Sequence, residues 1–282
     1  MRKDGSINLQ ALARHARWTL EHGCDSVTLF GTTGEGASLS LRDRSAMLGA
    51  ALGAGLDPAR QLLAGVTATS LDDAADQASL AYDAGCRGIL LMPPFYFKDV
   101  SDDGLFAWHA SLFERLKGAA RGVFLYHIPS QSATPISVSL IDRLRKAFPG
   151  VIAGVKDSSC DWPTQKAFLE AHSDIAVLVG DETQLARSVR EGGEGSICGV
   201  ANVAPGWLRP LVYEGKDDPR VHELVKAICA YPVMSAVKSL AAHLHGAGEE
   251  FATMRAPLPR LTEAQARTLA VAYDSLMKAQ AA

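Results

Sequence analysis

The sequence predicts an α/β fold, and a (β/α)₈ barrel is the architecture that fits it best. Short apolar runs of strand length alternate with amphipathic segments of helical length along most of the 282 residues. This alternation implies a parallel sheet covered by helices, because parallel strands need long crossover connections. With 48% hydrophobic residues, the chain can bury one large core. A barrel suits this size and rhythm, and a doubly wound sheet is the second candidate.

The predicted strands are apolar runs bounded by glycine, proline and small polar residues. They fall one short of the eight strands that close a barrel of this kind. The residues before Leu9 contain no apolar run, so a strand at the start of the barrel is missing from the prediction. The predicted strands are Ser26–Gly31, Gln61–Val66, Gly88–Met92, Val123–Ile128, Val151–Lys156, Ile175–Gly180 and Gly195–Val200.

Amphipathic segments between the strands are predicted helices, and Ser70 and Ser137 stand where an N-cap is expected. From about Asp218 the strand-like runs cease and helical stretches finish the chain. We therefore divide the chain into a barrel domain, residues 1–217, and a C-terminal domain of three helices, residues 218–282. The predicted helices are Leu9–Glu21, Asp72–Ala84, Asp103–Lys117, Ser137–Ala147, Trp162–His172 and Thr183–Glu191, followed by Arg220–Ala230, Met234–His245 and Thr262–Ala279.

Composition and charge argue against several classes of function. The net charge is -3 and both signs are interspersed without a basic stripe, so no nucleic-acid partner is expected. No apolar segment approaches the roughly 20 residues that cross a bilayer, so no membrane partner is expected either. The five cysteines lack paired spacing and predict reduced, mostly buried thiols in a cytoplasmic protein. They do not suggest a metal site, and we expect neither a metal nor an organic cofactor.

Lys156 is the residue that points most directly to chemistry. It ends the apolar run that begins at Val151, and Gly154 on the same face of the predicted strand leaves room beside it. An amine in apolar surroundings is held more readily in its neutral form, which can attack a ketone and form an imine. The alternative is a lysine that reaches from a strand end into solvent.

Two further polar groups are predicted at neighbouring strand ends. Tyr126 ends the strand before that of Lys156, and Gly31–Glu35 follows the first predicted strand. In a barrel, reactive residues gather at the C-terminal ends of the strands, so the phenol and the amine would converge. Taken alone, the glycine-rich segment could be a tight turn or a phosphate-binding loop, and Tyr126 could be a core residue. The coincidence of three such signals favours a catalytic site.

Five stretches of the chain resemble the family of dihydrodipicolinate synthase and N-acetylneuraminate lyase, and the likeness covers nearly the whole chain. The stretches are specific for the family and not for one substrate. They are Gly31-Thr32-Thr33-Gly34-Glu35, Pro94-Phe95-Tyr96, Tyr126-His127-Ile128-Pro129-Ser130, Gly154-Val155-Lys156-Asp157 and the segment from Gly195 to Pro205.

The resemblance implies a class I aldolase that forms its imine on Lys156, with a 2-oxo acid such as pyruvate as the small-molecule partner. Tyr126 would move protons, and Thr32 would link Tyr126 to Tyr96 from a neighbouring subunit. Thr33 would bind the carboxylate of the oxo acid. Such enzymes are usually homotetramers, built as dimers of dimers. Two further positions, Gly180 and Ile197, match residues that border the pyruvate pocket.

Two polar positions, Gln131 and Glu182, bear on the substrate. Synthases of this family carry an arginine where this chain has Gln131, and glutamine cannot bind a second carboxylate with full charge. The loss of such a bond, roughly 1.5–3 kcal/mol, would weaken the handling of aspartate semialdehyde about ten- to a hundredfold. Glu182 could bind the hydroxyls of a sugar acid, but a solvated carboxylate at a helix start is the preferred interpretation.

The resemblance also bears on the start of the barrel. Family members begin with an apolar strand, and this sequence begins at the turn that follows it, with Lys3-Asp4-Gly5-Ser6. Either the start was placed too late or the barrel is open at one edge. An open edge exposes unpaired backbone groups, so we expect lower stability and a tendency to aggregate for the sequence as given. Equal melting temperatures and activities with and without an upstream extension would contradict this expectation.

The sequence therefore favours a Schiff-base lyase or aldolase acting on pyruvate or another 2-oxo acid, with a 2-keto-3-deoxy sugar acid as the expected substrate type. One alternative is 4-hydroxy-tetrahydrodipicolinate synthase, which joins pyruvate to aspartate semialdehyde. A dehydratase that uses the same imine is a further alternative. From a different class, the chain could be a binding or regulatory protein that kept the pocket and lost catalysis.

Overall fold

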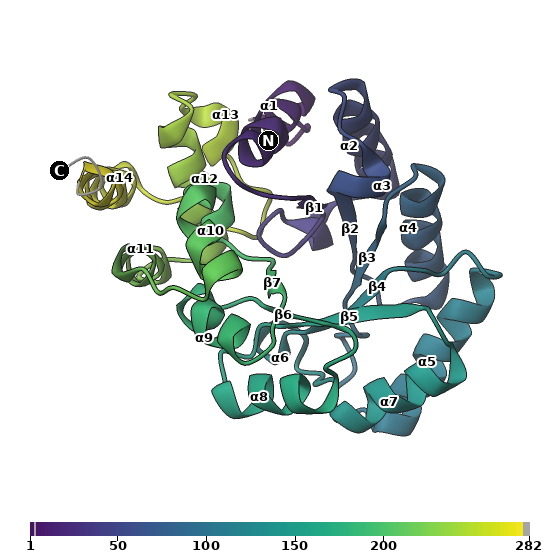
Figure 1. Ribbon diagram of the computed structural model, residues 1–282. Helices are drawn as coiled ribbons and strands as arrows, with labels where there is room; N and C mark the ends of the chain where they lie inside the picture. The colour runs from purple at the N-terminus through teal and green to yellow at the C-terminus, as the bar shows by residue number, and fades with distance from the viewer. Residues whose placement is uncertain (3, 279–282) are drawn as a thin grey trace.

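The computed structural model describes residues 1–2 and 4–278. Its seven strands form one parallel sheet in the order β1 to β7, so each strand pairs with its neighbour in the sequence. Figure 1 shows these strands curving around a common centre with helices on the outer side. The strands are β1 (Val27–Leu29), β2 (Leu62–Val66), β3 (Gly88–Leu91), β4 (Val123–His127), β5 (Ile152–Asp157), β6 (Ala176–Val179) and β7 (Gly195–Ser196).

Sequential strand order distinguishes the two folds that the sequence left open. A doubly wound sheet reverses its strand order at a switch point, whereas this sheet runs through without a reversal. The barrel prediction is therefore confirmed. The strands β1 and β7 are the two edges of the described sheet, which agrees with the expected absence of a strand before Leu9.

Most predicted helices are found to within about two residues, the usual scatter of helix ends. Side-chain caps start several of them: Asn8 begins α1, and Ser40 forms a capping box with Asp43 at the start of α2. The predicted helix Thr183–Glu191 is divided into a 3₁₀ turn, η2, and α9. The other turns are η1 (Gly36–Ser38) and η3 (Val200–Asn202). The helices are α1 (Leu9–Glu21), α2 (Leu41–Gly53), α3 (Pro58–Gln61), α4 (Leu71–Asp83), α5 (Asp102–Arg115), α6 (Pro129–Ser132), α7 (Val138–Ala147), α8 (Trp162–Ala171), η2 (Glu182–Gln184), α9 (Leu185–Arg190) and α10 (Pro205–Glu214).

The helix α10 has no counterpart among the predictions. It begins with Pro205, whose missing N–H costs nothing in the first turn, and it contains a second proline, Pro210. Gly215 ends it in the left-handed region, at φ 60°. An internal proline argues against a helix in the sequence, and tertiary packing overrides that preference here, since Trp207 and Leu211 are buried.

Beyond Asp218 the chain forms α11 (Pro219–Cys229), α12 (Val233–Leu244), the short α13 (Glu249–Ala252) and α14 (Glu263–Lys278). The predicted end of the last helix, Ala279, lies outside the described residues. Leu224, Leu240 and Leu269 of these helices join barrel residues such as Val179 in one buried cluster. Each buried leucine contributes about 1.5–3 kcal/mol, so the helices are firmly attached. The division into domains 1–217 and 218–282 stays a prediction.

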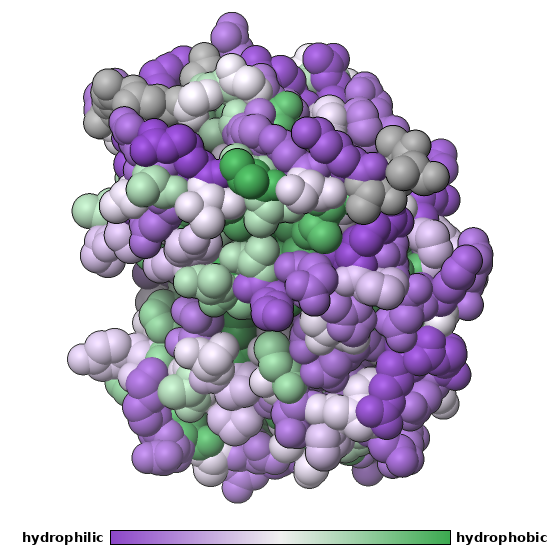
Figure 2. All heavy atoms as spheres, turned by 90° about the vertical axis from the view of Figure 1, so that its left-hand side faces the viewer, coloured by the Kyte–Doolittle hydropathy of each residue, from purple (hydrophilic) through white to green (hydrophobic). Residues whose placement is uncertain are grey.

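Figure 2 shows the face of the molecule that carries the C-terminal helices. Apolar side chains gather in the middle of this view, and polar side chains surround them. Val233 and Val271 are large apolar residues of these helices that are exposed. No single helix of the described residues is long and apolar enough to cross a membrane, although the bent pair α11 and α12 passes on length and composition.

The expectation that most cysteines are buried is wrong. Cys86 is buried, Cys24 and Cys198 are partly exposed, and Cys160 and Cys229 are exposed. All five thiols are free, as their scattered spacing predicted. The two exposed thiols lie after a strand and at the end of a helix, where the sequence gives no signal of depth.

Candidate active site

Lys156 and Tyr126 face each other across the adjacent strands β5 and β4. The two residues are direct register partners in the sheet, so their side chains leave it at the same level and on the same face. The Lys156 Nζ donates a hydrogen bond of 3.0 Å to the Tyr126 hydroxyl and lies 4.2 Å from the centre of its ring. Lys156 is 7% exposed and Tyr126 4%. The amine and the phenol are thus in contact and largely shielded from solvent.

The hydroxyl of Tyr126 has a second partner, the Thr32 Oγ1, at 3.3 Å. Thr32 belongs to the turn Gly31–Glu35, which follows β1 and is closed by bonds from the Gly34 and Gly36 amides to the Gly31 carbonyl. The structure therefore brings three of the predicted residues into one line of polar contacts, from Lys156 through Tyr126 to Thr32. A line of this kind can pass a proton.

The surroundings of Tyr126 change its acidity. Burial raises the pKa of its phenol, but the charge of Lys156 and hydrogen bonds with Thr32, Lys156 and Ser158 together outweigh burial. The pKa of Tyr126 therefore lies below its ordinary value, and the phenol gives up its proton more readily than a free tyrosine.

A cavity of about 350 Å³ opens beside this pair. Thr32, Thr33, Lys156 and Ile197 all line it, together with residues of α1, β1, α10 and α12. Its size is at the lower end of the range for small-molecule sites. Ile197 also packs against the apolar cluster that includes Tyr126. The cavity can therefore hold a small substrate against the amine and the threonines.

Ser158 is a member of the site that the sequence reasoning missed. Its side chain is one of the hydrogen-bond partners that lower the pKa of Tyr126, and its amide donates to the His127 carbonyl at 2.8 Å. The predicted residue Gly180 lies against it, since a Cβ added at Gly180 would stand 2.0 Å from the Ser158 Oγ. Gly180 therefore serves the site by leaving space for Ser158. The only sequence signal for Ser158 was its place two residues after Lys156 at a strand end.

Two predicted residues are exposed and do not line the cavity. Gln131, in the short helix α6, is exposed, and Tyr96, in the segment after β3, is 74% exposed. Tyr96 stacks edge-on against Phe97, which is 59% exposed. Within the described residues of one chain, the structure does not bring Tyr96 and Thr32 together.

The preferred interpretation of Glu182 as a solvated carboxylate is wrong. Glu182 is 7% exposed, and its Oε1 accepts a hydrogen bond of 2.7 Å from the Val200 amide. Burial raises the pKa of this carboxyl group, and the bond from Val200 opposes that effect. Its acceptor atom faces the backbone of η3, so Glu182 joins the segments after β6 and β7.

Comparisons with known proteins agree with the fold and identify the family. Residues 1–275 match the Dihydrodipicolinate synthetase family. The solved dihydrodipicolinate synthase from Agrobacterium tumefaciens str. C58 is 46% identical, with a TM-score of 0.94 over 98% of this chain and 96% of that one. The "Uncharacterized DapA-like lyase" of Chloroflexus aurantiacus is 28% identical over 97% of this chain and 92% of its own length.

A more distant structure shows the same fold. The 2-keto-3-deoxygluconate aldolase from Sulfolobus, solved in complex with D-KDPG, is 23% identical, with a TM-score of 0.86 over 99% of this chain and 93% of that chain. The match to the family extends over nearly the whole sequence and includes the strands that carry Lys156 and Tyr126. The chain therefore belongs to the dihydrodipicolinate synthetase family and is a carbon–carbon lyase of the class I aldolase type.

Proposed function

We propose that this protein makes or breaks a carbon–carbon bond next to a 2-oxo acid such as pyruvate, through an imine on Lys156. The observation that carries the proposal is the 3.0 Å contact between the buried Lys156 amine and the Tyr126 phenol, beside a cavity lined by Thr32 and Thr33. A buried amine next to a proton carrier is what imine chemistry requires. The proposal needs no metal and no organic cofactor.

The residues take the following roles. The free amine of Lys156 adds to the ketone carbon of the oxo acid, and the ketone oxygen takes up a proton that Tyr126 delivers. Loss of water then gives a protonated imine at the second carbon, which can accept the electron pair of the bond between the third and fourth carbons. Tyr126, now a phenolate, takes the proton of the hydroxyl group on the fourth carbon; the carbon–carbon bond breaks, an aldehyde leaves, and the electron pair forms an enamine. Tyr126 then returns the proton to the third carbon, and water hydrolyses the imine to release pyruvate and the free Lys156 amine. Thr32 orients the Tyr126 hydroxyl, and Thr33 binds the carboxylate of the oxo acid through its hydroxyl and backbone N–H.

For the second half of the substrate, we propose a 2-keto-3-deoxy sugar acid type. The support is Gln131, an exposed amide in α6 where a synthase of this family would present an arginine. A neutral amide suits hydroxyl groups better than a second carboxylate. Ile197 lines the cavity, and Gly180 acts in this proposal by leaving space for Ser158 beside Tyr126.

A second candidate is 4-hydroxy-tetrahydrodipicolinate synthase. Its support is the 46% identity to a solved structure that is named dihydrodipicolinate synthase. Aspartate semialdehyde carries a carboxylate and an amine instead of hydroxyl groups, so the two candidates differ in the charge that the outer pocket must bind.

The proposal is tested by incubating the folded protein with pyruvate and borohydride and then measuring its mass by mass spectrometry. Reduction of the imine is expected to add one pyruvate unit to the peptide that contains Lys156. An unchanged mass contradicts the proposal and favours a binding or regulatory protein. If the protein forms this adduct, it is then incubated with pyruvate and either a hydroxyaldehyde or aspartate semialdehyde. The product that forms separates the two candidates. Loss of water from a sugar acid without cleavage would identify a dehydratase.

We also propose that the protein assembles as a homotetramer, a dimer of dimers, in which Tyr96 reaches the Thr32 of a neighbouring subunit. The support is the exposure of the aromatic pair Tyr96 and Phe97, because such residues are enriched in buried contacts between chains. Light scattering is expected to give a tetramer, and Tyr96→Asp is expected to give smaller species. A monomeric wild-type protein would contradict this proposal.

We further propose a cytoplasmic location. Its support is that all five cysteines are free thiols, as is usual for proteins of a reducing compartment.

A further inference from the structure

Glu35 ends the turn that carries Thr32 and Thr33, and its side chain is turned into the protein. Its carboxylate is 0% exposed, and its backbone adopts the left-handed region at φ 58°. Such a conformation is unfavourable for a residue with a side chain, so the surroundings must hold it in place. A buried carboxylate also needs a positive partner.

The partners of Glu35 come from the far end of the chain. Lys238 of α12 donates from its Nζ to the Glu35 Oε1 and, at 2.9 Å, to the Thr253 carbonyl. The backbone amide of Arg255 donates to the other carboxylate oxygen at 2.9 Å. Both oxygens of Glu35 are therefore bound by the segment that follows Asp218. We call Glu35, Lys238 and Arg255 the Glu35 clamp.

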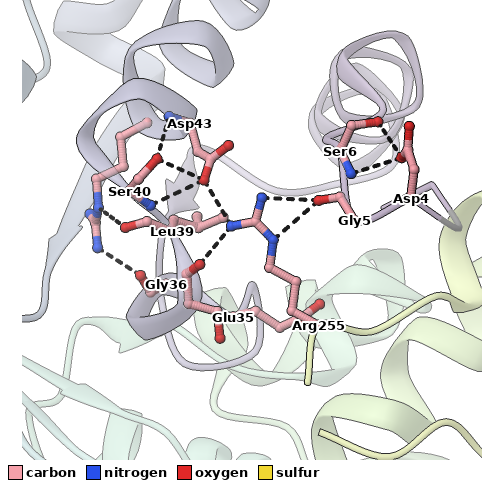
Figure 3. Close-up of polar contacts among 11 residues, drawn as sticks. Asp4, Gly5, Ser6, Glu35, Gly36, Leu39, Ser40, Asp43 and Arg255 are labelled. Carbon is pink, nitrogen blue, oxygen red and sulfur yellow. Dashed lines mark hydrogen bonds and ion pairs between the residues drawn. The ribbon is translucent and has the colours of Figure 1, made fainter. Parts of the chain in front are cut away.

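The side chain of Arg255 extends the clamp over the same turn. Its guanidinium donates to the Ser38 carbonyl at 2.6 Å, to the Asp43 carboxylate at 2.8 Å and to the Gly5 carbonyl at 3.0 Å. Figure 3 shows this guanidinium between Gly5 and Asp43, with the turn at Glu35 below it. The hydrogen bond from Arg255 holds the pKa of Asp43 at about 2, so both partners are charged at neutral pH.

A second arginine, Arg44, also binds the turn. Arg44 of α2 is 1% exposed and donates to the Gly36 carbonyl at 2.8 Å and to the Gly65 carbonyl at 2.7 Å. A Cβ added at Gly36 would stand 1.8 Å from the Phe30 carbonyl oxygen, so the backbone of the turn is closely packed at this position. The segment between Gly31 and Gly36 is therefore held at its second half, and its first half, with Thr32, projects toward Tyr126.

We propose that the Glu35 clamp positions Thr32 and Thr33 for the reaction, which makes the C-terminal helices a working part of the active site. The inference rests on the proposed function, because it assigns a task to the turn that would orient Tyr126 and bind the oxo acid. Glu35 and Lys238 act through the turn and are positioning residues. Release of the clamp lets the turn relax, and the 3.3 Å contact between Thr32 and Tyr126 is the first to lengthen.

The test compares Lys238→Met with two matched variants. Lys238→Arg restores a cation that can reach Glu35. Tyr273→Phe removes another buried hydrogen bond of the C-terminal helices, from the Tyr273 hydroxyl to the Val203 carbonyl at 2.7 Å, without contacting the turn. For each variant we would measure the melting temperature, the rate of imine trapping well below it, and the titration of Tyr126. The last is read as tyrosinate absorbance, by difference from Tyr126→Phe.

Lys238→Met is expected to slow imine formation about tenfold to a hundredfold, the scale of a misplacement of about 1 Å. It is also expected to raise the midpoint of the Tyr126 titration, since the hydrogen bond between Thr32 and Tyr126, which lowers the pKa of the phenol, is lost while Lys156 and Ser158 still face the phenol. Lys238→Arg should recover most of both effects, and Tyr273→Phe should change the melting temperature alone. The double variant Glu35→Gln/Lys238→Met should regain stability, because no buried charge is left alone, and should stay slow.

A Lys238→Met protein with lower stability but unchanged imine formation and Tyr126 titration would overturn the proposal, since the clamp would then be structural only. Equal slowing by Tyr273→Phe would overturn it as well. These outcomes are separate from a failure of the proposed function. If the wild type forms no adduct with pyruvate, the proposed function fails, and the Tyr126 titration still decides whether the clamp positions the turn.

Discussion

Replacement of Lys156 by alanine is expected to abolish imine formation and to lower turnover by about four orders of magnitude or more, the scale seen when a covalent nucleophile is removed. No other amine contacts Tyr126 among the interactions that set its acidity. Lys156→Arg is the matched variant, because a guanidinium can still donate a hydrogen bond to Tyr126 but, always protonated, cannot add to a ketone.

Mass spectrometry after treatment with pyruvate and borohydride measures the effect. Both variants should remain at the mass of the untreated protein, and circular dichroism should show that they are folded. A variant that still gains a pyruvate unit would place the imine on a different lysine and would end the assignment of Lys156.

Replacement of Tyr126 by phenylalanine is expected to slow imine formation and turnover by about 10²- to 10⁴-fold, the usual contribution of a positioned proton carrier. The ring and its packing against Ile197 are kept, while the hydroxyl that bonds to Lys156 and Thr32 is lost. The binding of pyruvate should change less than the rate, since Tyr126 does not bind the carboxylate in this proposal.

Thr32→Val is the companion variant, with a similar shape and no hydroxyl. Residues that act through one contact are not additive, so adding Thr32→Val to Tyr126→Phe should cost little more than Tyr126→Phe alone. Single-turnover rates with pyruvate provide the measurement. Fully additive losses would show that Thr32 acts independently of the phenol, and an unchanged rate in Tyr126→Phe would remove the phenol from the proton path.

The local sequence pattern predicted that Lys156 and Tyr126 lie together at the centre of the candidate site. An apolar run that ends in a lysine, and another that ends in a tyrosine, suffice to put both groups at the same end of a parallel sheet. The register of β4 and β5 pairs Tyr126 with Lys156 directly, which is why a prediction from strand ends agrees with the 3.0 Å contact. Their adjacency follows from the barrel, where strands that follow in sequence also pair in space.

The sequence could not predict the surroundings of the Glu182 and Glu35 carboxylates, because their hydrogen-bond partners lie far away in the sequence. The carboxylate of Glu182 looked solvated at a helix start, and only the position of the Val200 amide shows that it is buried and bonded. Glu35 was part of a recognised motif, yet its cation, Lys238, lies 203 positions further along the chain. No periodicity or spacing links two residues so far apart, and no local rule says which buried charges will meet.

The order in which the chain is made gives this separation a consequence for folding. As the polypeptide leaves the ribosome, the barrel strands emerge with a negative group at Glu35 whose counter-charge has yet to be synthesised. Until α12 has been synthesised, the Glu35 carboxylate must stay in contact with water. The turn Gly31–Glu35 therefore cannot reach its buried position during synthesis. Exchange of C-terminal helices between family members would face the same constraint, and hybrids should succeed when Glu35 and Lys238 are inherited together.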